Sequence, residues 1–348
     1  SGTLTSAVHS DAAETTATAE IFEGMKRAQS SDTLTVLEII GVNEHWLIQP
    51  SELTIPFPPK VLGRGGFGVV VEATFCHTTV ALKMFGGSLA DDVVTIDRTC
   101  INELRFLRHL RHPNIVSFIG ASFGRRGNSP MIVLEKVVGK PLRRYLQHCN
   151  ASCSPKAGPH HLQNREAANC AKTVMQGVIR ALVYLHSRKP PVVHSDLKPS
   201  NIIVVENLAM EPMPKLLDFG LTRAVTRHAV VGGGTDKYMA PEVDLANRKI
   251  KARPPIDIYS LGRILSVSAV FGLSDETPDP GAAACTPLLE EWRSVITVCL
   301  SHDPHQRPTA QEVYAEVFVT SQGPAPSQGP APSQGPAPMP IGRTTALY

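Results

Sequence analysis

Several features that would place this sequence in a specialised class are missing. No uninterrupted apolar run is long enough to cross a bilayer, and the N-terminus has no charged-then-apolar signal pattern, so we expect no membrane segment in this chain. The seven cysteines are an odd number without the spacing of a disulfide framework, which favours reduced thiols in a cytoplasmic setting. The formal net charge of +3 is too small to indicate a nucleic-acid partner. The chain starts at Ser1 rather than at Met, which leaves open whether an N-terminal sensor or membrane region precedes it.

The composition that is present indicates a globular protein with extended ends. Hydrophobic residues make up 42% of the 348 residues, which is enough to build one large domain or two lobes. Residues 1–34 are rich in Ser, Thr and Ala without sustained periodicity, so we expect a flexible arm over 1–55, with a short helix suggested around 19–27 and an entry strand at its end. The motif Ser-Gln-Gly-Pro-Ala-Pro occurs three times from residue 321 onward, and this density of Pro and Gly predicts a disordered tail over 320–348.

The most informative stretch is His-Ser-Asp-Leu-Lys-Pro-Ser-Asn at 194–201. Asp196 could accept a proton, Lys198 could neutralise a phosphate oxygen, and Asn201 could bind a metal ion. Asp218, in the tripeptide Asp-Phe-Gly, supplies a second hard oxygen ligand. An acid, an amine and two oxygen ligands suit phosphoryl transfer from a magnesium-bound nucleotide, in which catalysis is mostly positioning and charge neutralisation.

A second group of motifs precedes this stretch. Gly-Arg-Gly-Gly-Phe-Gly at 63–68 runs into a β-branched segment, which predicts a hairpin, whereas a dinucleotide fingerprint needs a helix there. Glycines let the backbone approach phosphates closely because no Cβ intrudes. Val80-Ala-Leu-Lys83 predicts a strand that ends in an amine. An amphipathic helix is expected over 101–110, and Glu103 on it is the candidate charge partner of a buried Lys83.

Taken in this order, the motifs resemble those of the eukaryotic protein kinases over about 56–318. The lead-in Trp-Leu-Ile-Gln-Pro-Ser-Glu-Leu-Thr-Ile at 46–55 is similar to the start of kinase domains in the tyrosine-kinase-like group. The resemblance implies an α+β, bilobal fold over 56–319, with a small, mostly β N-lobe over about 56–136 and a larger, mostly helical C-lobe over about 137–319. It also implies transfer of the γ-phosphoryl group of ATP to Ser or Thr hydroxyls of protein substrates, with Mg2+ as cofactor, in signal transduction.

The same resemblance implies a role for each site residue. Asp196 would be the catalytic base and Lys198 would stabilise the transferring phosphoryl group, while Asn201 and Asp218 would hold magnesium. Leu134 corresponds to the gatekeeper behind the adenine, and residues 135–137 correspond to the hinge. The residues expected to surround the nucleotide are Gly63, Gly65, Gly66, Phe67, Gly68, Val70, Ala81, Lys83, Glu103, Leu134, Glu135 and Val137.

Structural and regulatory positions follow from the resemblance as well. Asp257 is expected to hold the catalytic-loop backbone, and Arg307 to pair with Glu242. Residues 222–231 form the expected activation segment. Ser195 stands where regulated kinases usually carry Arg, so we expect that loop phosphorylation read through the catalytic loop is not needed. The rival expectation is that another cation compensates, the candidates being Arg108, Arg223 and Arg227.

Three alternatives remain at this level. A kinase-like scaffold or nucleotide-binding pseudokinase is the main rival, although no catalytic position has been lost. A small-molecule kinase is disfavoured because Glu242 and Arg307 belong to a protein-substrate platform. Residues 148–161 could bind zinc, but the spacing of His148, Cys149, Cys153, His160 and His161 fits no common zinc pattern, so a solvated insertion loop is expected. The sequence does not identify the protein substrate, the upstream signal or the oligomeric state, and it leaves dual specificity open.

Overall fold

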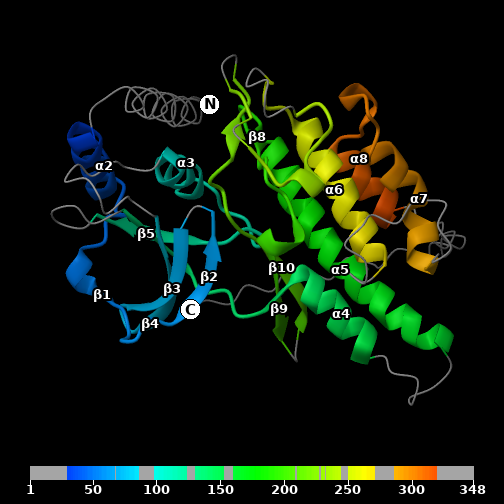
Figure 1. Ribbon diagram of the computed structural model, residues 1–348, viewed down its shortest axis with the longest axis horizontal. Helices are drawn as coiled ribbons and strands as arrows, with labels where there is room; N and C mark the ends of the chain where they lie inside the picture. Colours follow the sequence, from blue (N-terminus) through cyan, green and yellow to red (C-terminus); the bar gives the residue numbers. More distant parts are fainter. Residues whose placement is uncertain are drawn as a thin grey trace, which may run out of the picture.

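The computed structural model describes residues 30–66, 68–85, 98–123, 130–152, 160–207, 210–226, 229–231, 233–243, 250–270 and 286–319. Figure 1 shows two lobes, a twisted β-sheet with helix α3 on one side of the molecule and a bundle of helices on the other. The expected α+β, bilobal fold is therefore confirmed. Within the described ranges, each helix is too short or too polar to span a bilayer.

The N-lobe is built on a six-stranded antiparallel sheet. Its strands are β1 (Leu53–Thr54), β2 (Val61–Gly65), β3 (Gly68–Phe75), β4 (Thr78–Met84), β5 (Phe118–Ser122) and β6 (Met131–Glu135). They follow the order β1-β3-β4-β6-β5, with β2 paired to β3. Side chains alternate between the two faces of a strand, so Val80 and Leu82 of β4 pack in one core cluster while Ala81 packs in the other. Lys83 ends the buried part of this strand, as the sequence predicted.

Helix α3 (Arg98–Leu107) packs its apolar stripe against this sheet. Leu104 and Leu107 are fully buried and Leu110 is nearly so, which confirms the predicted apolar face. The sequence predicted that this helix would end at Leu110, but it ends at Leu107. The amide of Leu110 instead donates to the carbonyl oxygens of Phe106 and Leu107, a tightened last turn that leads into the His112-Pro113 segment.

The flexible arm predicted over residues 1–55 is wrong for residues 30–43. These residues form helix α2 (Ser30–Asn43), which buries Leu37 and Ile40 in the main core. Beyond the helix, the amide of Ile48 donates to Ala121 and the amide of Ala121 donates to Trp46, so the chain extends the sheet beside β5. The entry strand is present as the two-residue β1, which pairs with β3. The helix suggested at 19–27 lies outside the described residues, as does the tail at 320–348.

The C-lobe is mainly helical. Its helices are α4 (Leu142–Ser152), α5 (His160–His186), α6 (Pro254–Ala269), α7 (Pro287–Cys299) and α8 (Ala310–Tyr314), the last continued by a π-helical turn at Ala315–Val319. Short strands accompany them: β7 (Lys140–Pro141), β9 (Ile202–Asn207) and β10 (Met210–Leu216) form one sheet, and β8 (Val192–Val193) pairs with β11 (Arg223–Ala224). Helix α6 is buried along most of its length and carries Asp257 in its first turn, so this acid is held inside the lobe.

The insertion loop predicted over residues 148–161 is wrong at both of its ends. His148 and Cys149 belong to α4, while His160 and His161 belong to α5. Cys153 lies outside the described residues. The thiols of Cys149 and Cys170 interact where α4 meets α5, and the interaction with Cys149 lowers the pKa of Cys170 although burial opposes the shift. The local composition had suggested a loop over the whole stretch. The structure instead extends α4 to Ser152 and begins α5 at His160, where the two helices pack on one another.

Candidate functional site

A cleft of about 460 Å3 lies between the two lobes, a volume within the range of small-ligand sites. It brings together most of the residues that the sequence predicted around a nucleotide: Gly63, Gly65, Gly66, Gly68, Val70, Ala81, Lys83, Glu103, Leu134, Glu135, Val137, Asn201 and Asp218. Lys198 also reaches its wall. Phe67 lies outside the described residues. Residues that the sequence did not single out complete the lining: Leu62, Arg64, Val116, Pro141, Ser200, Ile203 and Leu217.

The glycine-rich segment forms the roof of this cleft. A Cβ added at Gly63, Gly65 or Gly66 would meet nothing within 4 Å, so the backbone there faces open space. Gly68 is different, because its φ is +137° and an added Cβ would lie 2.1 Å from the carbonyl oxygen of Met84. Steric crowding within the sheet therefore requires glycine at Gly68. At the other three positions, glycine leaves room above the cleft.

Lys83 lies between two carboxylates inside the cleft. Its Nζ is 2.5 Å from Glu103 Oε2 on α3 and 2.8 Å from Asp218 Oδ1, so the predicted pair with Glu103 is present. Burial works against the ammonium, but the charges of Glu103 and Asp218 outweigh it and the pKa of Lys83 is raised. Burial raises the pKa of Glu103, which is fully buried, because Lys83 only partly offsets the lost hydration. Burial likewise opposes the ionised form of Asp218, but Lys83 outweighs it and the pKa is lowered.

Asp257 holds the catalytic loop from the start of α6, as the resemblance implied. Its Oδ2 accepts from the amide of His194 at 2.8 Å and its Oδ1 accepts from the amide of Ser195 at 2.9 Å. Nε2 of His186 lies 3.0 Å from Oδ2. Burial alone would raise the pKa of Asp257, but the hydrogen bond and charge of His186, together with the backbone donors, lower it overall. This carboxylate supports the left-handed backbone of Ser195, whose φ is 69°.

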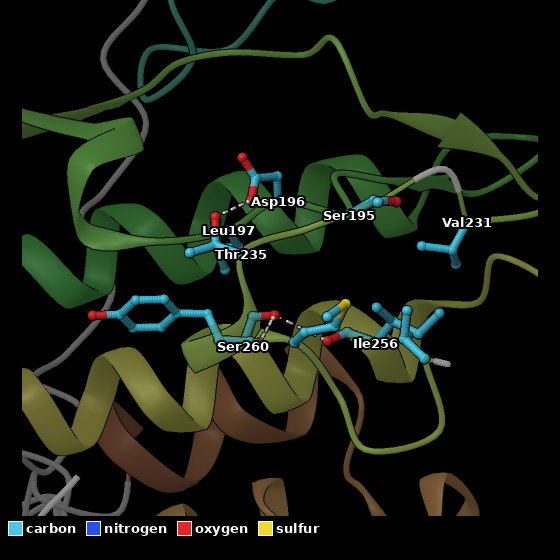
Figure 2. Close-up of a pocket in the computed structure, with 11 residues that line it drawn as sticks. Ser195, Asp196, Leu197, Val231, Thr235, Ile256 and Ser260 are labelled. Carbon is cyan, nitrogen blue, oxygen red and sulfur yellow. Dashed lines mark hydrogen bonds between the residues drawn. The ribbon is translucent and has the colours of Figure 1, made fainter. Parts of the chain in front are cut away.

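The end of the catalytic loop forms a closed polar group around Asp196. Its Oδ2 lies 2.6 Å from Lys198 Nζ, and its Oδ1 accepts from the hydroxyl of Thr235 at 2.8 Å. Lys198 also donates to Thr235 Oγ1 at 2.8 Å. Both amide hydrogens of Asn201 point at Asp196, to its backbone oxygen at 2.9 Å and to Oδ2 at 3.2 Å. Figure 2 shows Asp196 and Thr235 meeting, with Ser195 pointing away from Asp196 on the side of Val231.

Ser195 offers no positive charge of the kind that an Arg at this position would present to a phosphate group. The Ser195 side chain lines a cavity of about 10 Å3 together with Val231 and Gly233, and its buried Oγ has no hydrogen-bond partner among the described residues. Two of the candidate compensating cations are engaged elsewhere, since Arg108 pairs with Glu44 and Arg223 donates to the carbonyl oxygens of Thr222 and Val230. Arg227 lies outside the described residues.

The activation segment also needs a correction. Thr222, the first residue of the expected segment, is fully buried and its hydroxyl donates to the carbonyl oxygen of His194. Modification there would need local opening, whereas Thr226 is exposed. Sequence position alone could not distinguish these two threonines, because burial depends on how the segment returns across the catalytic loop.

The donor set of the cleft fits a magnesium-bound nucleotide. Magnesium prefers oxygen ligands, often one or two carboxylates together with substrate phosphates. The amide nitrogen of Asn201 donates to Asp196, so the amide oxygen of Asn201 is left to bind a cation. Asp218 lines the same cleft. Lys83 adds a cation near these oxygens, as a site for phosphate groups needs.

Below the cleft, an ion pair ties the segment after Thr235 to the C-lobe. Nη1 and Nη2 of Arg307 each lie 2.7 Å from one carboxylate oxygen of Glu242. The same guanidinium donates to the carbonyl oxygens of Ser301, Pro255 and His302. The pairing expected from the resemblance is therefore present, with the bidentate geometry that makes such contacts strong.

Known proteins match most of this chain. A family model described as protein kinase domain matches residues 59–319. The serine/threonine-protein kinase VIK of Arabidopsis thaliana is 32% identical over 290 residues, which cover 77% of this chain and 60% of that protein. Mitogen-activated protein kinase kinase kinase 7 of Homo sapiens is 30% identical over 269 residues, which cover 73% of this chain and 40% of that protein. The dual specificity protein kinase splA of Dictyostelium discoideum is 27% identical over 281 residues, which cover 73% of this chain and 11% of that protein. The chain thus spans about three fifths of the length of VIK and smaller shares of the other two relatives.

Proposed function

This chain belongs to the protein kinase domain family, and from that membership we propose that it transfers the γ-phosphoryl group of ATP to Ser or Thr hydroxyls of protein substrates. The observation that carries the proposal is the contact of Asp196 and Thr235 with Lys198, which itself lines the cleft that contains Lys83 and Asp218. Phosphoryl transfer needs an acid, cations and metal-binding oxygens close together, and these contacts support that arrangement. We expect the functional unit to cover residues 56–319, as the sequence predicted.

In the proposed reaction, Asp196 orients the substrate hydroxyl and accepts its proton. Lys198 already lies against that carboxylate and would stabilise charge on the transferring phosphoryl group. Lys83, held by Glu103, would contact the α and β phosphates, and the backbone of the glycine-rich segment would cover them. Asn201 and Asp218 would hold magnesium, which when bound supplies charge neutralisation at the phosphoryl oxygens.

The acceptor preference is proposed on the contacts of Lys198 and Thr235. Lys198 donates to Thr235, and Thr235 donates to Asp196, so both residues contact the group proposed to accept the proton of the substrate hydroxyl. The names of VIK and of mitogen-activated protein kinase kinase kinase 7 agree with this preference, whereas splA is named a dual specificity kinase. Tyrosine therefore belongs among the acceptors to be tested.

The test is phosphorylation of a peptide array by the purified chain with magnesium and ATP, using Ser, Thr and Tyr acceptors. We expect transfer to Ser and Thr peptides and its loss in Asp196→Asn. Asp303→Asn, at an exposed helix cap far from the cleft in the C-lobe, is the matched control and should keep activity. Nucleotide binding without transfer in the unmodified chain would contradict the proposal and would support a kinase-like scaffold.

A further inference from the structure

Asn102 on α3 makes contacts that the motifs do not explain. It immediately precedes Glu103, yet its side chain points to the segment that follows Asp218. Its Nδ2 lies 2.8 Å from the carbonyl oxygen of Gly220, 2.9 Å from that of Thr222 and 3.4 Å from that of Phe219. An amide group has two hydrogens, so the two shorter contacts satisfy it and the third is weaker. Asparagine is a poor helix former, so its place in the interior of α3 calls for such a reason.

A second observation places the same face of α3 against the same segment. Thr99 lies one turn before Asn102, and residues three apart share a helix face. A Cβ added at Gly220 would lie 2.6 Å from Thr99 Cγ2, so α3 and the chain after Asp218 are in close packing. The same added atom would lie 3.5 Å from Asp218 Oδ1 and 3.7 Å from Glu103 Oε2. The contact therefore adjoins the two carboxylates that bind Lys83.

These contacts close a ring. Glu103 ties α3 to Lys83, Lys83 is bound to Asp218, and Asn102 ties the backbone just after Asp218 back to α3. In a closed ring, displacement of one member strains the other links, so the helix and the Asp218 segment are expected to move together. Without Asn102, the two would still be coupled through the Lys83 side chain, through the backbone hydrogen bond from Phe219 to Glu103 and through packing, but the backbone at Gly220 and Thr222 would lose its side-chain donor.

We propose that Asn102 is a positioning residue, which holds the backbone at residues 219–222 so that Asp218 faces the cleft only while α3 is docked. The inference rests on the proposed function for its meaning, because it assigns to Asn102 the alignment of a magnesium ligand. It acts through three backbone oxygens, so it does not depend on the side chains of the segment that it holds. The position had one signal in the sequence, a weak helix former next to the predicted Glu103.

The test compares variants of Asn102 in the full chain. Asn102→Asp is nearly isosteric but puts oxygens in place of the donors, facing three carbonyl oxygens. Asn102→Ala removes the contacts without repulsion, and Asn102→Gln keeps the donors on a longer arm. The matched control is Asn114→Ala, because Nδ2 of Asn114 also donates to a backbone oxygen, that of Pro214 at 2.9 Å in β10, and so holds the chain before Asp218 but not the backbone after it.

Two measurements distinguish positioning from a general loss of stability. The first is hydrogen exchange at residues 218–224 and 98–107 in ligand-free protein, and the second is the magnesium dependence of binding of a non-hydrolysable ATP analogue. For Asn102→Asp we expect about tenfold faster exchange in both segments and a several-fold higher magnesium requirement. We expect smaller changes for Asn102→Ala, and Asn102→Gln should be nearest to the unmodified chain. Asn114→Ala should lower the melting temperature without either local change.

The proposal is overturned if the Asn102→Asp and Asn102→Ala proteins exchange at the unmodified rate in residues 218–224. It is also overturned if their effects match those of Asn114→Ala. Hydrogen exchange needs neither nucleotide nor transfer, so it decides the role of Asn102 even if the unmodified chain transfers no phosphate. Failure of the proposed function and failure of this inference are therefore separate results. If Asn102→Asp does not fold, the comparison of Asn102→Ala with Asn102→Gln decides the question.

Discussion

Replacing Lys83 by Met should make the free energy of unfolding depend steeply on pH, because its buried partner Glu103 loses the compensating charge. Glu103 is fully buried, and its Oε1 already has no hydrogen-bond partner among the described residues. Without Lys83 it would keep the backbone hydrogen bond from Phe219 but face the like charge of Asp218 uncompensated, so its pKa, already raised by burial, should rise further. Removing one partner of a buried ion pair typically costs roughly 3–5 kcal/mol because the remaining charge is uncompensated.

The loss of stability in Lys83→Met has an upper limit, because Glu103 can take up a proton instead of remaining charged. Its ordinary pKa is 4.5, so neutralising it at pH 7.5 costs about 4 kcal/mol, at about 1.4 kcal/mol per pH unit. The native state would then hold one more proton than the unfolded state. The stability of Lys83→Met should therefore fall by about 1.4 kcal/mol for each pH unit above 4.5, up to the raised pKa of Glu103, and should recover as the pH is lowered.

The assay is urea denaturation of Lys83→Met, of Glu103→Gln and of the double variant between pH 5.5 and 8. The double variant lacks both charges, so we expect it to be more stable than Lys83→Met above pH 7 and to lose the steep pH dependence. Activity should be lost in Lys83→Met and reduced less in Glu103→Gln, because Asp218 still holds the Lys83 ammonium at 2.8 Å. The reasoning is refuted if Lys83→Met shows the same pH dependence of stability as the unmodified chain. A lower kcat/KM for Glu103→Gln than for Lys83→Met would refute the ordering of activities.

Three further outcomes are expected. Asp218→Asn should abolish transfer with little change in melting temperature, because an amide is a much weaker magnesium ligand than a carboxylate of the same shape; comparable activity across a magnesium titration would contradict this. Arg307→Ala should lower the free energy of unfolding, measured by urea denaturation, by roughly 3–5 kcal/mol. Lys172→Ala, which breaks a partly exposed pair with Glu291, should lower it by under about 1 kcal/mol. Equal losses would show that burial does not decide the difference. Phosphatase treatment and Thr226→Ala should change kcat/KM less than tenfold, because Ser195 offers no charge to a loop phosphate. A larger fall, above roughly 1.4 kcal/mol of transition-state stabilisation, would point to another cation as the phosphate receptor.

The sequence by itself predicted the candidate site residues and determined much of the local structure. The alternation along β4 and the three-residue spacing of leucines in α3 are properties of neighbouring residues, so periodicity was enough to predict both elements. Asp196, Lys198, Asn201 and Asp218 lie in short motifs whose spacing does not depend on the rest of the fold. The resemblance of these motifs, in their order along the chain, to those of the protein kinases then implied a bilobal architecture, which the structure has.

Tertiary structure decided which residues these groups contact. The contact between Asn102 and Thr222 joins residues 120 apart in the sequence, and no local pattern encodes such a distance. Burial works in the same way: Thr222 is enclosed while Thr226 is exposed, because the segment returns across the catalytic loop between them. Helix α2 was missed for a related reason. The polar composition of residues 1–34 suggested a solvated arm that includes the start of this helix, whereas the order of the helix comes from placing Leu37 and Ile40 in a core that the rest of the chain builds.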